Sequence, residues 1–170
     1  MASYMEHPSR ATRYASGAYV VYPAALEENT TVWFAFDVER ELWEGLLAIR
    51  EGEDRARLVG VPLWTYGLHL DDVVEYIESG EGAAVASRVV EPSDNRTFRV
   101  TYPDLRPGDD DDRWRQLLID MEPWDCWFDV LGPGYLAISA PAATVEAVER
   151  YLDHGAGAGD FLYESGDSPA

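Results

Sequence analysis

The sequence contains no lysine: all 13 of its basic residues are arginine, against 32 aspartate and glutamate residues, and the formal net charge is -19. A negative field of this size repels nucleic acids and anionic membranes, so it argues against functions that depend on gripping a phosphate backbone. It attracts cations and basic proteins instead. Two interpretations of the acidity stay open: adaptation of a whole proteome to salt or to a GC-rich genome, and attraction of a basic partner.

Only one cysteine is present, Cys126, which excludes an internal disulfide and a thiolate metal site built by this chain alone. It lies between Trp124 and Trp127 on an expected strand, where burial raises a thiol pKa and leaves the sulfur unreactive. The sequence also lacks an apolar run of the length that crosses a bilayer, and no apolar segment follows its first charges. We therefore expect a cytoplasmic protein.

Histidine is scarce as well. His7, His69 and His154 are far apart, none belongs to a paired metal-binding or catalytic motif, and no serine lies in a Gly-x-Ser-x-Gly elbow. The Gly-rich stretch at 155–159 follows an expected helix instead of preceding one, so it does not have the phosphate-binding form. The sequence therefore favours a protein with no catalytic residues, no metal site and no cofactor.

What is present is enough apolar material for a core, with 46% hydrophobic and 12% aromatic residues. The polar start, which shows no periodicity, predicts a loose leader. The expected fold class is α+β: a small β-barrel-like meander packed on a ferredoxin-like (βαββαβ) unit. The expected division of the chain is a leader at 1–17, the barrel-like half at 18–95, the ferredoxin-like half at 96–165 and a tail at 166–170.

Aromatic and β-branched residues at strand length, separated by Gly-, Pro- and Asn-bearing turns, predict the strands of residues 18–102. A helix over 39–49 is an alternative to the strand at 42–50, because Leu42, Leu46 and Ile49 also fit helical spacing. The last three segments, joined by short turns, predict a meander. The expected strands are 18–22, 31–38, 42–50, 55–62, 73–77, 85–90 and 97–102.

The last third of the chain shows helical spacing in addition to strand patterns. Trp114, Leu117, Leu118 and Met121 recur at helical intervals after an acidic run, and Pro123 ends the pattern. A hairpin at 126–140, a second helix at 145–155 and a final strand at 160–164 follow. Counted from Thr97, the order strand, helix, strand, strand, helix, strand is that of a ferredoxin-like unit.

Several of these segments also form a recognisable series: VPLWTYGL at 61–68, DDVVE at 71–75, RVVE at 88–91 and RTFRV at 96–100. The series resembles a bacterial family known as domain of unknown function 4265, and the segments 135–141 and 159–164 are similar to that family's ending. The resemblance covers about residues 33–164. It departs at Asp71, where the family usually has a small residue, most often glycine. The resemblance implies an architecture and no chemistry, because the family carries no agreed activity.

Two groups of residues are candidates for binding. A loop that carries Trp64, Tyr66, His69 and Asp72 has the side chains to hold a ligand by stacking and hydrogen bonding, or to close a barrel end, with Asp72 capping a turn. The acidic run Asp109, Asp110, Asp111 and Asp112, with Trp114 beside it, is either a solvated helix start or an electrostatic contact for a basic partner. The run lacks the alternating ligands of a Ca²⁺ loop.

We therefore expect a non-catalytic, acidic, cytoplasmic binding protein that recognises a basic protein partner, in the manner of an immunity protein or antitoxin. Nucleic acid and membrane are not expected partners. A small-molecule-binding regulatory module and a small enzyme with an unrecognised site are the alternatives: a pocket lined by Trp64, Tyr66 and His69 would favour the first, and titratable groups converging there would favour the second.

Overall fold

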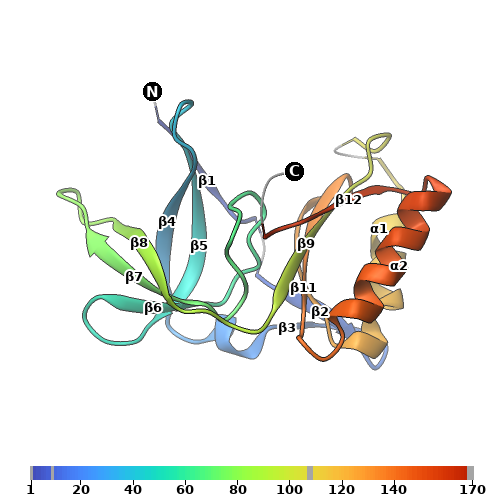
Figure 1. The fold of residues 1–170 in the computed structure, drawn as a ribbon, viewed down its shortest axis with the longest axis horizontal. Helices are drawn as coiled ribbons and strands as arrows, with labels where there is room; N and C mark the ends of the chain where they lie inside the picture. The colour runs from blue at the N-terminus through green and yellow to red at the C-terminus, as the bar shows by residue number, and fades with distance from the viewer. Residues whose placement is uncertain (1, 9, 107–108, 168–170) are drawn as a thin grey trace.

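The computed structural model describes residues 2–8, 10–106 and 109–167, and it has two sheets with a pair of helices on the second (Figure 1). The protein is a mixed α+β fold dominated by strands. Neither α-helix in the described part of the chain combines the length and the apolar composition needed to cross a membrane.

Five strands close into a barrel, at the left of Figure 1. β5 pairs antiparallel with both β4 and β6, β6 pairs with β7, β7 with β8, and β8 returns parallel to β4. Inward-facing side chains such as Val32, Leu46 and Val74 are fully buried and form the barrel core. The barrel strands are β4 (Thr30–Asp37), β5 (Leu42–Arg50), β6 (Arg55–Leu58), β7 (Val73–Glu78) and β8 (Ala84–Glu91).

The second sheet has the order β12-β9-β11-β10-β2-β3, with every neighbouring pair antiparallel. Its strands are β2 (Thr12–Ala15), β3 (Ala18–Val21), β9 (Arg96–Thr101), β10 (Trp127–Gly132), β11 (Tyr135–Ala140) and β12 (Leu162–Ser165). The helices that cover one of its faces are α1 (Arg113–Asp120) and α2 (Val145–Ala158). Two short 3₁₀ turns, Pro23–Leu26 and Glu122–Trp124, complete the elements.

Alternation along the strands gives the second sheet two different faces. Leu136 and Ile138 of β11 pack with Leu117 and Leu152 of the helices, in one apolar cluster. The opposite face, turned toward the barrel, carries buried polar side chains, among them Thr97, Arg99, Asp129 and Ser139. A buried polar group needs a partner, so this second face determines how the two halves are joined.

The join is made by residues 59–72, which run between β6 and β7 without forming a strand and which we call the connecting segment. Val61, Leu63 and Leu70 of this segment are buried, and they pack with Ala11 and Ala137 in a third apolar cluster. The connecting segment therefore lies against the N-terminal residues and against the second sheet.

Four expectations about the first hundred residues need correction. The segment expected as a loose leader contains β1 (Ser3–Glu6), which pairs parallel with β5, and also β2. β3, expected in the barrel, pairs with β2 in the second sheet. β9 lies between β11 and β12, so the expected three-stranded meander is the β7–β8 hairpin alone. The alternative helix over 39–49 is also wrong, because these residues form β5 with strand alternation.

Candidate functional site

Glu44 holds the connecting segment from inside the barrel end. Its side chain is fully buried on β5, and its carboxylate accepts the backbone N–H groups of Leu63 at 2.6 Å, Trp64 at 3.2 Å and Thr65 at 2.7 Å. A segment without a strand partner must find acceptors for its N–H groups elsewhere. The Glu44 carboxylate therefore supplies the hydrogen-bond acceptors that a neighbouring strand would supply to a strand of a sheet.

His7 lies beside Glu44, between two buried acids. Its Nε2 is 2.7 Å from Glu44 Oε1, and its Nδ1 is 3.3 Å from Asp129 Oδ2. Asp129 Oδ2 also accepts the N–H of Val61 at 2.7 Å. His7 comes from the residues between β1 and β2, Glu44 from the barrel and Asp129 from the second sheet, so this cluster ties three parts of the chain together.

Burial and the neighbouring charges have opposite effects on the pKa values of the groups in this cluster. Burial lowers the pKa of His7, but the hydrogen bonds and charges of Asp129 and Glu44 outweigh it and raise that pKa to about 9. Burial favours a higher pKa for Glu44, yet His7 and the N–H donor of Thr65 bring it below its ordinary value. For Asp129 burial prevails and the pKa is raised. The imidazole side chain is only 3% exposed, so the cluster is an internal ion pair and offers no approach for a substrate.

Asp72 caps a turn, as expected. Its Oδ2 accepts the N–H of His69 at 2.8 Å and its Oδ1 accepts the N–H of Ser93 at 2.6 Å. The residue before it, Asp71, has a positive φ of 70°. This is the left-handed region that glycine adopts most easily, which accounts for the glycine that the resemblance leads us to expect at that position.

His69 is buried and contacts both a hydroxyl and a carboxylate. Its Nδ1 is 3.0 Å from Thr97 Oγ1, and its Nε2 is 3.2 Å from Asp167 Oδ1, the same oxygen that the Arg96 guanidinium approaches to 3.7 Å. Burial lowers the pKa of His69, against the charges of Asp72 and Asp167. Thr97 is fully buried and donates its own proton to the carbonyl oxygen of Leu68, so its hydroxyl is engaged within the fold.

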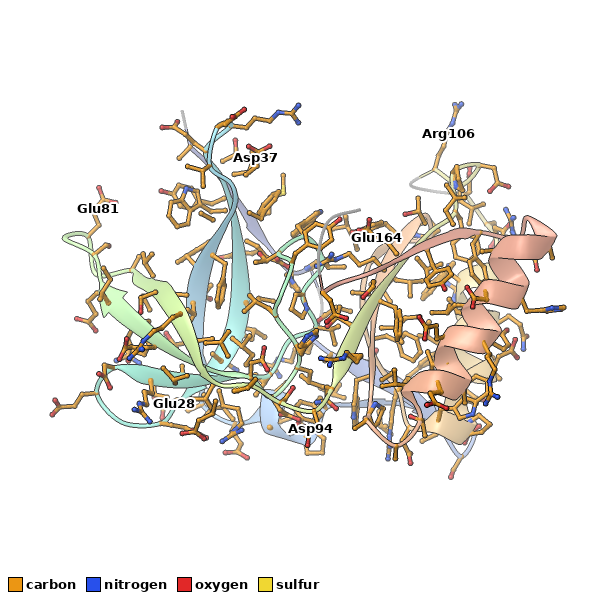
Figure 2. All side chains as sticks on the ribbon, viewed as in Figure 1. Glu28, Asp37, Glu81, Asp94, Arg106 and Glu164 are labelled. Carbon is orange, nitrogen blue, oxygen red and sulfur yellow. The ribbon has the colours of Figure 1, made fainter. Side chains whose placement is uncertain are left out.

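Tyr66 and Trp64 point in different directions. The Tyr66 hydroxyl donates to Glu164 Oε1 at 2.8 Å, and the Arg99 guanidinium lies 4.3 Å from the centre of its ring. Figure 2 shows Glu164 in the space between the two halves. Trp64 instead stacks on Phe36, with ring centres 5.9 Å apart, and meets His7 edge-on. Of the four predicted loop residues, only Tyr66 lines one of the clefts described next.

Two hollows adjoin each other at the barrel wall, one at the gap between β4 and β8 and one on the outward face of the strands. β4 and β8 pair at only two positions, ending at Trp33 and Val85, and beyond these positions the strands separate. The cleft beside this gap has a volume of about 290 Å³ and is lined by Phe34, Trp43, Thr65, Tyr66, Val85 and Arg88 among others. The second hollow, of about 350 Å³, is lined by Tyr4, Trp33, Trp43, Ser79, Glu81, Ala83 and Val85. The two share Trp43 and Val85 as walls.

Sequence reasoning missed the residues of the second hollow. Trp33 and Ala35 on β4, and Trp43 and Gly45 on β5, alternate with the buried Phe34 and Glu44, so they face outward. A large aromatic residue at an outward strand position is the feature that marks this surface. Tyr4 could not be assigned to it, because the pairing of β1 with β5 is visible only in the fold.

The acidic run lies far from both hollows and is partly neutralised by the chain itself. Asp111 pairs with Arg113, which also reaches Asp104 at 2.6 Å, and Asp112 pairs with Arg115. Trp114 is half-buried and packs against the core of the second sheet, with the Arg115 guanidinium 4.7 Å from its ring centre. Among the residues that the structure describes, no group of His, Cys, Asp or Glu side chains is arranged to hold a metal ion.

Comparison with known proteins bears on the fold and on the family. A solved structure, described as a novel crystal structure of a hypothetical protein from Neisseria gonorrhoeae, is similar with a TM-score of 0.66 and 19% sequence identity, covering 84% of this chain and 95% of that chain. No curated protein matches the sequence. The model of the family described as Domain of unknown function (DUF4265) matches residues 44–163, and the chain belongs to that family.

Proposed function

We propose that this is a non-catalytic, cytoplasmic binding protein whose partner is a protein with a basic face, and that it acts in the manner of an immunity protein or antitoxin. The charge carries the proposal: the net charge is -19, and most of the arginines already pair with carboxylates of the same chain. Most of the remaining acids that the structure describes lie at the surface, and Glu44, Asp72 and Asp129 are the buried exceptions. Such a field accelerates the approach of a basic partner and opposes that of nucleic acid.

The acids that the structure describes are spread over the surface and do not form a single acidic patch, so a basic partner would be attracted from all sides. Figure 2 shows the labelled acids Glu28, Asp37, Glu81 and Asp94 at well-separated points on the outside of the barrel half. A field spread in this way steers encounter but does not by itself fix one docking geometry. Specific recognition then needs a shaped surface in addition to the charge.

The buried ionisable groups support a binding protein over an enzyme. His7, Glu44, Asp72 and Asp129 all hold backbone or one another inside the fold. A catalytic acid or base must reach a substrate atom within hydrogen-bond distance. These side chains are used to join the two halves and to close turns.

We also interpret the C-terminal half as a ferredoxin-like unit that β2 and β3 extend. The support is the strand order β12-β9-β11-β10, with α1 after β9 and α2 after β11. In this interpretation the helices cover one face and the barrel half covers the other.

The experiment is capture on the immobilised protein from the cytoplasm of its own source, at low and at high salt. The proposal expects a basic protein that is retained at low salt and released at high salt, and that binds again when it is purified and added alone. If no basic protein is retained at low salt, the proposal is wrong.

A small-molecule-binding regulatory module is the second candidate, because the cleft lined by Tyr66 has a volume close to the lower end of ligand sites. Binding of a neutral small molecule in that cleft would be insensitive to salt. Thermal stabilisation by a panel of metabolites that persists at high salt would favour this candidate over the first.

A further inference from the structure

The hollow lined by Tyr4, Trp33, Trp43 and Glu81 has the chemistry of a receptor for a cationic side chain. We propose that it binds an arginine side chain of a basic partner protein. This would supply a specific contact, which the diffuse negative field does not provide by itself. This inference rests on the proposed function and adds to it the place of contact and the kind of residue that is recognised.

The rings are held in fixed positions by one another. Tyr4 meets Trp33 edge-on, with ring centres 5.1 Å apart and planes at 81°, and it lies nearly parallel to Trp43 at 6.3 Å. The register explains this contact, because Tyr4 of β1 lies directly opposite Trp43 of β5. Aromatic anchors that are rigid before binding lose little entropy on binding.

Gly45 allows Trp33 to lie across the neighbouring strand. A Cβ at this position would be 2.8 Å from the six-membered ring of Trp33, closer than real contacts allow. Because position 45 has no side chain, the indole rests on the backbone of β5 and presents its surface beside Tyr4. The hollow is therefore shaped by a specific glycine and not by chance exposure of large side chains.

The chain already uses its arginines in this way elsewhere. Guanidinium groups lie over the rings of Trp127 at 4.8 Å, Tyr66 at 4.3 Å and Trp114 at 4.7 Å. Among the described residues no arginine lies over the rings of the hollow, so a cation from another molecule would not compete there with a guanidinium of the same chain. Aromatic faces attract cations, and arginine also stacks on them through its planar guanidinium.

Glu81 gives the hollow a charge that suits this occupant. It lies in the turn between β7 and β8, at the tip of that hairpin in Figure 2, and lines the same hollow. A second copy of the chain would bring the same net charge of -19 to the surface and would be repelled. A neutral apolar segment would leave Glu81 without a counter-charge. The cation of a basic segment can contact the aromatic rings and also pair with the Glu81 carboxylate.

The test uses short capped peptides of alternating glycine and arginine, with matched peptides in which lysine or the neutral citrulline replaces arginine. Binding is measured by tryptophan fluorescence and calorimetry at high salt, where diffuse attraction is screened. We expect the arginine peptide to bind about threefold or more tightly than the lysine peptide, and the citrulline peptide to bind weakest.

Two exposed positions in the hollow are then changed and compared with matched controls elsewhere. Tyr4→Ala should weaken arginine-peptide binding about threefold to tenfold and remove the preference for arginine over lysine, and Glu81→Gln should weaken binding of both peptides. Tyr19→Ala and Asp94→Asn remove an exposed ring and an exposed acid on other faces, and both should leave binding unchanged. Denaturation curves establish that each variant is folded.

The outcomes separate this inference from the proposed function. If the arginine peptide binds but Tyr4→Ala and Tyr19→Ala behave alike, or if citrulline binds as well as arginine, the hollow is not the anchor, and the basic-partner proposal stands without it. If the purified captured partner binds the Tyr4→Ala variant as tightly as the unaltered protein, the inference is also wrong. A failure of the salt-dependent capture itself would overturn the proposed function.

Discussion

His7 Nε2 lies 2.7 Å from Glu44 Oε1, a contact that joins the residues between the first two strands to the start of the fifth strand, inside a buried cluster. Loss of the imidazole would leave two buried carboxylates, Glu44 and Asp129, without their cation. Breaking a buried ion pair from one side is strongly destabilising, because the remaining charge is buried without a counter-ion. This buried ion pair is therefore one of the main contacts that hold the two halves together.

The first prediction is that His7→Ala lowers the free energy of unfolding by about 3 kcal/mol. The matched control is His154→Ala, which removes an exposed histidine from α2 and should change stability by less than about 0.5 kcal/mol. Chemical denaturation of both variants measures the difference. Equal, small effects would mean that the buried carboxylates tolerate the loss of His7.

The second prediction concerns pH. The pKa of His7 rises from 6.5 to about 9 on folding, so the folded state binds the proton more tightly than the unfolded chain does. The resulting stabilisation is fully present below pH 6.5 and is lost as the pH rises through about 9. The free energy of unfolding should fall by about 3 kcal/mol across this window. Titration of stability with pH checks it, and the slope should largely disappear in His7→Ala and persist in His154→Ala.

This cluster also shows what the sequence could and could not predict. Most of the strands after residue 17 and both helices follow from local patterns, such as the spacing of Leu117 and Met121 or the polar turn before β8. Which strands pair with one another does not follow from such local patterns. Phe98 and Val100 alternate with Thr97 and Arg99 in the same way whether β9 joins the barrel or the second sheet, so only the fold places it.

The same reason explains the error in the N-terminal segment. His7 and Ala11 have no local periodicity, and their burial depends on partners from distant parts of the chain, including Glu44 and Asp129. One indication was available: Glu44 is an acid at an inward position in an otherwise apolar strand, which requires a buried partner. Among the candidate binding residues, Asp72 caps a turn, which the sequence offered as the alternative to ligand binding, because capping depends on neighbours in sequence.

The third prediction is that Cys126 does not react with thiol reagents in the folded protein. The side chain is buried, and burial raises its pKa to about 12, so the thiolate is scarce at mildly alkaline pH. Labelling with a chromogenic disulfide should proceed only through unfolding and become fast in denaturant. His7→Ala should accelerate labelling in proportion to its loss of stability. Rapid labelling of the native protein would contradict the burial of the sulfur.

The fourth prediction concerns the acidic run, whose members Asp111 and Asp112 already pair with Arg113 and Arg115. Replacing Asp109, Asp110, Asp111 and Asp112 together with asparagine should leave the protein folded. It should slow association with a basic partner about threefold at low salt, with no effect at high salt. Stopped-flow measurements at two salt concentrations check this. A change in dissociation rate that survives high salt would instead make the run part of the contact surface.

The fifth prediction concerns Asp71, which has a positive φ of 70° and accepts a hydrogen bond from the Tyr22 hydroxyl at 2.6 Å. Asp71→Ala keeps the backbone strain and removes the acceptor, so it should lower the free energy of unfolding by about 2 kcal/mol. Asp71→Gly also removes the acceptor but relieves the strain, and it should cost about 1 kcal/mol less than alanine.

A double-mutant cycle with Tyr22→Phe isolates the hydrogen bond from the backbone effect. In the Tyr22→Phe background, Asp71→Ala should cost less than in the unaltered protein by the value of that bond. The advantage of glycine over alanine should be the same in both backgrounds, because it arises from φ at position 71 alone. If glycine and alanine are equally harmful, the left-handed backbone at Asp71 carries no strain, and the glycine expected there from the family has another cause.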